Sequence, residues 1–212
     1  MKIVIIDYKS GNIQSLIHAL QEIGCDFLLS SKKEDILNAD RVILPGVGAF
    51  GRCIEQFKNF KLDLVIKEYV ASGKYVLGIC VGMQILFEES NEFKRNEGLG
   101  IIKGQVKKLP VSAKNGERIK IPHTNWSPIY SPQKKKWINT PFSNIVENEY
   151  VYFVHSYHAI PSNKDEVIAL TSIGGHDICA AIQKENVFGC QFHPEKSGNV
   201  GLSILRNFIA LK

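Results

Sequence analysis

Short apolar runs alternate with stretches of helical periodicity along the amino-terminal part of the chain. Apolar runs bounded by turn residues indicate buried strands, whereas apolar residues that recur every three to four positions indicate amphipathic helices. Such alternation is typical of a parallel sheet covered by helices, so the pattern predicts an α/β fold. We expect strands at residues 3–7, 27–29, 42–44 and 75–79, a turn at residues 10–11, and helices at residues 12–23, 36–38 and 62–72.

The pattern changes after Leu99, where short apolar runs are separated by turn signals. These runs predict mostly antiparallel strands that extend or flank the parallel sheet. A last helix is expected at residues 199–211, where apolar side chains recur at helical spacing. The sequence contains no internal repeat or linker-like segment, so we expect residues 1–212 to form one domain. The expected strands lie at residues 104–109, 118–121, 136–138, 151–154, 167–170, 178–183 and 187–191.

A cysteine flanked by glycines, in the segment Gly-Ile-Cys-Val-Gly at residues 78–82, follows the last expected parallel strand. A strand, a sharp turn and a helix with a nucleophile at the corner form the elbow of Gly-x-Ser-x-Gly hydrolases. Glycine is favoured beside the nucleophile because the strained turn leaves little room for side chains. The amphipathic stretch at residues 83–87 predicts the helix of this elbow, whose positive amino-terminal end would favour a thiolate at Cys80.

A histidine and an acid two residues apart, His193 and Glu195, supply the proton shuttle that a cysteine nucleophile needs. Taken alone, Cys80 would be interpreted as a buried core cysteine, which is the commoner role of a lone cysteine, and His193 as a hydrogen-bonded turn histidine. A metal site is a weaker alternative, because zinc would normally require further ligands that no spacing provides. Together, the three residues predict an enzyme.

Net charge and cysteine content limit the classes of function. The formal net charge is +5, and the three lysines at 134–136 are interpreted as a solvated loop or strand edge rather than a nucleic-acid patch. The five cysteines form no Cys-x-x-Cys pair, which favours a reduced, cytoplasmic setting. The first residues predict a strand rather than a signal peptide, and no apolar run is long enough to span a membrane.

Several short motifs occur in a definite order, at residues 7–8, 11–12, 45–50, 78–84, 122–123, 153–157 and 191–197. Their order and spacing resemble those of class I (triad) glutamine amidotransferases, whose fold is flavodoxin-like, and specifically the glutaminase subunits of imidazole glycerol phosphate synthase. The resemblance implies that Cys80 attacks the side-chain amide of L-glutamine to form a γ-glutamyl thioester. It also implies that His193 deprotonates the thiol and then protonates the departing ammonia, while Glu195 orients the imidazole.

The segment Pro-Gly-Val-Gly at residues 45–48 matches the oxyanion strand of the family. By that resemblance, backbone N–H groups of Gly46, Val47 and Gly48 would meet the negative oxygen of the tetrahedral intermediate. The resemblance also implies that the strand must reorient before an effective hole exists, which couples hydrolysis to the partner's substrate. Without the resemblance, the segment is an ordinary glycine loop between a strand and a helix.

Four further residues fall where the family binds glutamine or lines the site. The resemblance implies that Gln84 and Glu92 hold the amino-acid end of the substrate, with Glu92 paired to its α-ammonium group. His155 and Tyr157 match a segment that lines the site and the partner-facing region. Each has a structural alternative: an exposed helix residue for Gln84, a solvated acid for Glu92, and strand residues for the other two.

Free ammonia would be protonated and diluted in bulk water, so this chemistry benefits from an enclosed route to an acceptor. The resemblance implies a heterodimer with a (β/α)8 cyclase subunit, which makes imidazole glycerol phosphate and AICAR from PRFAR in histidine biosynthesis. Thioester chemistry requires neither a cofactor nor a metal. No nucleic-acid or membrane partner is expected.

The sequence departs from the family in the motif Pro-His-Met-Gly-Trp-Asn near the subunit interface, which reads Pro-His-Thr-Asn-Trp-Ser at residues 122–127. We expect His123 and Trp126 to lie at that interface. Because Thr124 and Asn125 replace the usual pair, one alternative is a paralogous glutaminase that serves another synthase, such as one amidating a surface-polysaccharide or flagellin sugar. A non-catalytic interaction subunit is a third interpretation, which the intact Cys-His-Glu set disfavours.

Overall fold

The computed structural model describes residues 1–9, 13–133 and 137–212, and its centre is a seven-stranded sheet with the order β11-β12-β13-β4-β3-β1-β2. The strands β2, β1, β3, β4 and β13 run parallel, and β12 and β11 continue the sheet in antiparallel orientation. The strand bounds are β1 Ile3–Ile6, β2 Phe27–Ser30, β3 Arg41–Leu44, β4 Tyr75–Ile79, β11 Val167–Ile173, β12 His176–Lys184 and β13 Val187–Cys190.

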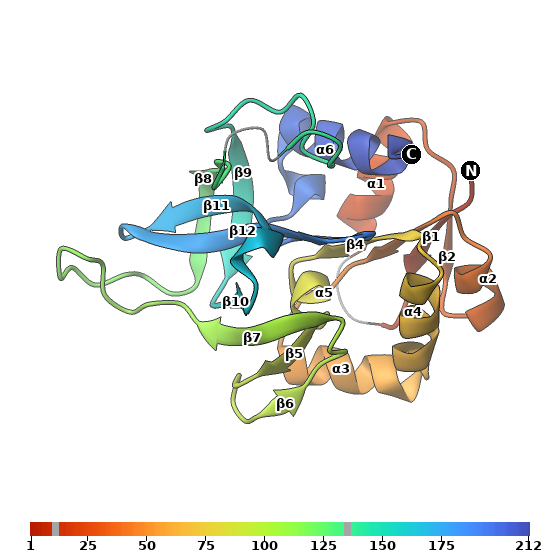
Figure 1. The fold of residues 1–212 in the computed structure, drawn as a ribbon, viewed down its shortest axis with the longest axis horizontal. Helices are drawn as coiled ribbons and strands as arrows, with labels where there is room; N and C mark the ends of the chain where they lie inside the picture. Colours follow the sequence, from red (N-terminus) through yellow and green to blue (C-terminus); the bar gives the residue numbers. More distant parts are fainter. Residues whose placement is uncertain (10–12, 134–136) are drawn as a thin grey trace.

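Helices cover both faces of this sheet, with α1 and α6 on one side and α3 and α4 on the other (Figure 1). This arrangement buries the central parallel strands on both sides, which explains their continuous apolar sequences. In α6 the residues Leu202, Ile204, Leu205 and Phe208 form the apolar stripe that packs into the core. The helix bounds are α1 Gln14–Glu22, α2 Lys33–Leu37, α3 Phe50–Asn59, α4 Leu62–Ala71, α5 Val81–Gln84 and α6 Gly198–Ala210, with short 3₁₀ turns η1 Lys164–Glu166 and η2 Pro194–Lys196.

Two smaller sheets lie beside the central one. The first has four strands in the order β10-β7-β5-β6, and the second is the antiparallel pair β8-β9 (Figure 1). Residues at the end of β9 and the start of β10 line a cavity together with Cys80, so these strands meet the carboxyl end of β4. Their bounds are β5 Phe87–Ser90, β6 Asn96–Glu97, β7 Ile102–Lys108, β8 His123–Pro128, β9 Tyr150–His155 and β10 Tyr157–Pro161.

The predicted α/β fold with a mostly parallel sheet and added antiparallel strands is confirmed, and most differences concern single elements. Helix α3 was not expected, because its polar positions outweigh its apolar ones and it directly follows the glycine loop. Residues 118–121 were expected as a strand, but they form only an isolated bridge between Ser112 and Arg118 around the exposed Asn115-Gly116 turn. Ile138 lies in a turn rather than a strand.

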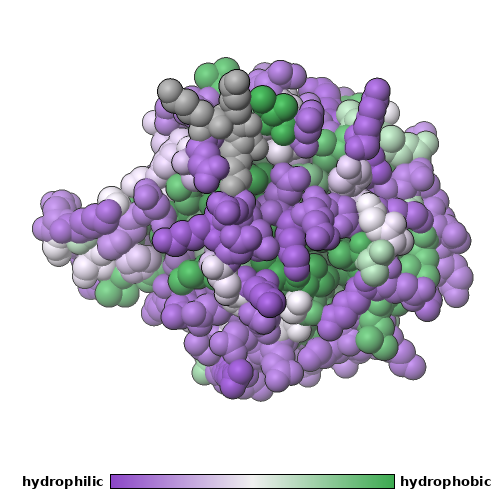
Figure 2. All heavy atoms as spheres, viewed as in Figure 1, coloured by the Kyte–Doolittle hydropathy of each residue, from purple (hydrophilic) through white to green (hydrophobic). Residues whose placement is uncertain are grey.

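Some expectations fall outside the described residues. They are the turn at residues 10–11, the helix start at residue 12, and the solvated lysines at 134–136. Hydrophilic side chains cover most of the face in Figure 2, with apolar ones showing between them. Within the described ranges, no helix has the length and apolar character needed to cross a membrane.

Candidate active site

Cys80 stands at a strained corner between β4 and α5. Its φ of 53° and ψ of −113° are unusual for a residue with a side chain, and such strain is characteristic of functional corners. The corner is held by backbone hydrogen bonds from Cys80 N to Cys190 O at 2.7 Å and from Gln84 N to Cys80 O at 3.1 Å. A Cβ on Gly78 would lie 2.7 Å from Met83 Cα, and one on Gly82 would overlap the Leu44 carbonyl oxygen. Both flanking positions therefore require glycine.

The helix after the nucleophile is shorter than predicted. It spans Val81–Gln84 only, and Phe87 already begins β5, so the expected helix at residues 83–87 is wrong. All four residues of α5 are buried, which removes the polar face that an amphipathic helix would show. A single turn carries little macrodipole, and the expected dipole contribution at Cys80 is correspondingly small.

His193 and Glu195 lie against this corner. The His193 ring donates Nδ1–H to Glu195 Oε1 at 2.7 Å, and both side chains are almost fully buried. The other ring nitrogen, Nε2, is buried and has no hydrogen-bond partner among the described residues, and both His193 and Cys80 line the same cavity. Burial lowers the pKa of His193, but the hydrogen bond to Glu195 and the negative charge of Cys80 and Glu195 outweigh it and raise the pKa to about 10. The surroundings of His193 therefore favour the protonated imidazole.

A cavity of about 270 Å³ opens over the Cys80 side chain. Its wall combines segments that are far apart in the sequence, so the fold brings the predicted nucleophile, base, oxyanion segment and glutamine-binding residues together. The lining residues are Val47, Gly48, Cys80, Val81, Gln84, Glu92, Pro122, Val154, His155, Ser156, Tyr157 and His193.

The predicted oxyanion strand is held in a closed arrangement. The N–H after a nucleophile is the usual oxyanion donor at such elbows, but Val81 N–H donates instead to Gly46 O at 3.3 Å. The neighbouring carbonyls are also occupied, since Tyr8 donates its hydroxyl to Pro45 O at 2.7 Å and Cys53 donates its thiol to Val47 O at 3.4 Å. An oxyanion would have to replace the Gly46 carbonyl as the acceptor from Val81.

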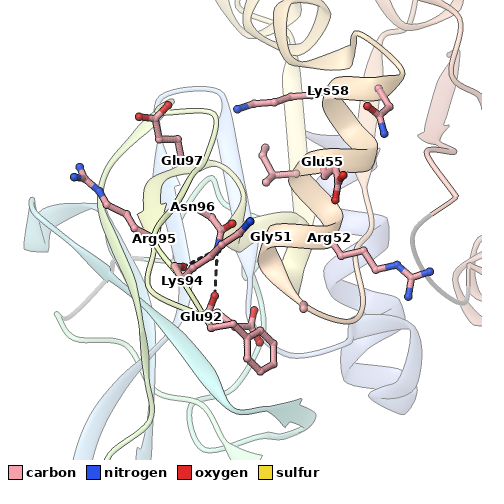
Figure 3. Close-up of a pocket in the computed structure, with 13 residues that line it drawn as sticks. Gly51, Arg52, Glu55, Lys58, Glu92, Lys94, Arg95, Asn96 and Glu97 are labelled. Carbon is pink, nitrogen blue, oxygen red and sulfur yellow. Dashed lines mark hydrogen bonds between the residues drawn. The ribbon is translucent and has the colours of Figure 1, made fainter.

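Glu92 has two neighbours that matter for its predicted role. It lines the cavity over Cys80, and its Oε2 accepts the Phe50 N–H at 2.6 Å at the start of α3. It also borders a second hollow of about 1000 Å³ between α3 and the β5-β6 hairpin, where Asn96 Nδ2 donates to Glu92 O at 3.1 Å (Figure 3). The carboxylate therefore caps a helix while it remains at the edge of the cavity.

Residues 4–211 match the family described as "Glutamine amidotransferase class-I". The chain belongs to this family. It is 44% identical over 208 residues to imidazole glycerol phosphate synthase subunit HisH 1 of Legionella pneumophila (strain Lens), covering 98% of each chain. It is 45% identical over 206 residues to subunit HisH of Bacillus cereus (strain G9842), covering 97% of this chain and 93% of the relative.

Solved structures show the same class I amidotransferase fold. A glutamine amidotransferase structure aligns with a TM-score of 0.72 at 17% identity and covers 98% of this chain and 97% of its own. The structure of PurLQS from Thermotoga maritima aligns with a TM-score of 0.69 at 20% identity, with the same coverage. At this level of identity the likeness concerns the fold alone.

Within this amidotransferase fold, the predicted interface residues lie on β8. His123 faces inward, with Nδ1 at 3.2 Å from His155 Nε2, and it does not line the cavity itself. Trp126 is 46% exposed, and its ring meets the Tyr152 ring edge-on at a centroid distance of 6.0 Å. The structure thus separates the pair: Trp126 is at the surface and His123 is directed toward the site.

Gln191 is a site residue that the sequence indicated only as part of a motif. Its side chain is fully buried, and its Nε2 lies 3.6 Å from Cys80 Sγ. Its position directly after β13, two residues before His193, is the only sequence signal for this contact. In the described parts of the chain, no three His, Cys, Asp or Glu side chains are grouped to hold a metal ion.

Proposed function

We propose that the chain hydrolyses L-glutamine to glutamate and ammonia and delivers the ammonia to a synthase subunit of histidine biosynthesis. The observation that carries this proposal is the arrangement of Cys80, His193 and Glu195 beside one cavity. The high identity to relatives named as HisH subunits of imidazole glycerol phosphate synthase supports the choice of synthase.

The reaction begins with attack of the Cys80 sulfur on the glutamine side-chain carbonyl carbon. The C–N bond breaks, His193 Nε2 gives its proton to the leaving nitrogen, and a γ-glutamyl thioester and ammonia result. Water, deprotonated by His193, then attacks the thioester and releases glutamate and the free sulfur. Glu195 keeps the imidazole oriented throughout, through the 2.7 Å bond to Nδ1.

The glutamine backbone groups have partners at the cavity rim. Glu92 pairs with the α-ammonium group, and Gln84 presents an oxygen, because both hydrogens of its amide are used elsewhere. Gly46, Val47 and Gly48 supply the oxyanion hole after the strand turns. His155 and Tyr157 form the opposite wall.

The acceptor subunit is a (β/α)8 cyclase barrel in a cytoplasmic heterodimer, and it converts PRFAR to imidazole glycerol phosphate and AICAR with the delivered ammonia. Trp126 lies at the contact between the subunits. An enclosed route between the two sites keeps ammonia from protonation in bulk water.

The test is glutaminase activity of this chain alone and mixed with the histidine-pathway cyclase barrel and PRFAR. We expect slow hydrolysis by the isolated chain, because Gly46 occupies the Val81 N–H, and strong stimulation with formation of imidazole glycerol phosphate in the mixture. Cys80→Ala is the control: turnover with glutamine falls by about a thousandfold or more, while turnover with added ammonium salts remains.

Two results would contradict the proposal in different ways. Rapid hydrolysis without a partner contradicts the coupling through the oxyanion strand. Absence of binding and stimulation, while a glutamine analogue still alkylates Cys80, points to an active glutaminase for a different synthase. The exposed Thr124 and Asn125 on β8 are the observation that favours this second candidate.

A further inference from the structure

The side chain of Gln191 connects the nucleophile to the opposite wall of the cavity. It is fully buried directly after β13, and its Nε2 lies 3.6 Å from Cys80 Sγ. Its Oε1 accepts a hydrogen bond from Gln84 Nε2 at 2.9 Å. Each end of the Gln191 amide therefore has one partner, and the two partners come from opposite ends of α5.

The Tyr157 carbonyl determines how these amides are oriented. A carbonyl oxygen only accepts hydrogen bonds, so the Gln84 group that lies 3.0 Å from it must be the amide nitrogen. That nitrogen donates its second hydrogen to Gln191, which must present its oxygen there. The Gln191 nitrogen is consequently the group that faces Cys80, and it donates to the sulfur.

The same carbonyl orders a second branch that leads to β8. His155 Nδ1 lies 2.9 Å from Tyr157 O and must donate, which leaves its Nε2 as an acceptor for His123 Nδ1 at 3.2 Å. His123 Nε2 then accepts from the Ser127 hydroxyl at 3.1 Å. Burial lowers the pKa of His123, and burial lowers the pKa of His155 to about 3, so both rings are neutral as this order requires.

A proton cannot pass along the whole chain of hydrogen bonds. Both branches donate into the Tyr157 carbonyl, and a carbonyl has no hydrogen to hand on. The network therefore fixes positions rather than moving charge. Its members come from α5, β8, β9, the start of β10 and the residue directly after β13. The network therefore connects the antiparallel pair β8-β9 to the corner that carries Cys80.

We propose that Gln191 is a further residue of the glutaminase site, whose amide N–H holds the Cys80 sulfur in place and whose orientation is imposed by the Tyr157 carbonyl through Gln84. The catalytic role of Gln191 rests on the proposed glutaminase function. The contact between Gln191 and the Cys80 sulfur can be tested without glutamine. His193 approaches the sulfur with a proton that it must transfer, whereas Gln191 keeps its hydrogen. Gln191 thus stabilises the negative sulfur before it attacks, and again when the thioester is hydrolysed and the sulfur leaves.

The direct test is the alkylation rate of Cys80 by iodoacetamide in the full-length chain, measured by mass spectrometry of the Cys80 peptide. Gln191→Met keeps the size of the side chain and removes the donor. Because a hydrogen bond to a charged acceptor is lost, we expect alkylation about tenfold slower than in the wild type. The matched control is Gln183→Met, at a half-buried glutamine of β12 whose side-chain amide donates to the nearby Glu185 carbonyl, and it should leave the rate unchanged.

A second variant tests the dependence on Gln84. Gln84→Met removes the donor that orients Gln191, so the Gln191 amide can turn, and we expect a smaller slowing of about threefold. The double variant should be no slower than Gln191→Met alone, because both changes remove the same contact. If each change only loosened the packing, the slowing in the double variant would be the product of the two single slowings.

Folded Gln191→Met with a wild-type rate overturns the proposal, as does a double variant whose loss is the product of the single losses. If thermal unfolding shows that Gln191→Met does not fold, Gln84→Met decides the matter: an unchanged alkylation rate in this folded variant is enough to overturn the proposal. Failure of the proposed function would appear separately, as a wild-type chain that does not hydrolyse glutamine even with the cyclase barrel while the alkylation differences persist.

Discussion

The charge of His193 depends strongly on Cys80 and Glu195, which raise its pKa. A group with a raised pKa contributes stability that is complete below its unfolded value and is lost as the pH rises through the folded value. For His193 the pKa is 6.5 in the unfolded chain and about 10 in the folded chain. The folded chain therefore binds a proton across this interval that the unfolded chain has released.

We expect the free energy of unfolding to fall as the pH is raised from 7 to 10, with a contribution from His193 of at most about 1.4 kcal/mol per pH unit. His193→Gln removes the titrating ring and should flatten this part of the curve. Urea unfolding at a series of pH values measures both proteins. Parallel curves for the two would show that His193 is not held protonated.

At the scale of elements, the corner between β4 and α5 depends on how closely β3 approaches it. Gly82 lies so near the end of β3 that a Cβ would overlap Leu44 O, and backbone atoms have little freedom to move in a buried sheet. The corner and the oxyanion segment after β3 are consequently one packed unit.

Gly82→Ala should lower the free energy of unfolding by about 1–3 kcal/mol, as expected for overpacking, and should displace Cys80 enough to reduce its alkylation. Gly51→Ala in α3 is the comparison, because the atoms nearest to its Cβ, from 2.8 Å, belong to the Asn96 side chain and not to the backbone of a buried strand. Denaturant unfolding compares them. Equal stabilities of the two variants would refute the close packing described at Gly82.

The sequence predicted those elements that have a strong local signal. The strands at 3–7 and 75–79 and the cysteine corner were predictable, because apolar runs and flanking glycines act over a few residues. The length of α5 was not, since its burial depends on β3 and the smaller sheets. Likewise, the contact of His123 with His155 requires the register of β8 with β9, and the role of Gln191 requires the distant Tyr157 carbonyl. Such pairings leave no periodic trace in the sequence.

At the scale of the whole molecule, the antiparallel pair β8-β9 carries two exposed aromatic side chains, Trp126 and Tyr150, and the end of β9 lines the cavity. If the cyclase barrel covers this pair of strands, the indole leaves water on association. We expect the Trp126 emission to shift to shorter wavelength on titration with the barrel. Trp137, the second tryptophan, is 7% exposed, so Trp126→Phe should abolish most of the change. An unchanged spectrum on proven association would place the contact elsewhere.

The Gly46 carbonyl that occupies the Val81 N–H has a consequence for inhibitors. An analogue with an anionic oxygen must displace a tethered competitor, and a tethered group acts at a high effective concentration. Its affinity for the isolated chain is therefore reduced by the population of the closed strand. A subunit that favours the open strand therefore raises the affinity of the chain for such an analogue. By thermodynamic reciprocity, the bound analogue raises the affinity of the chain for that subunit by the same factor. A bound oxyanion mimic should thus stabilise the complex of the two proteins.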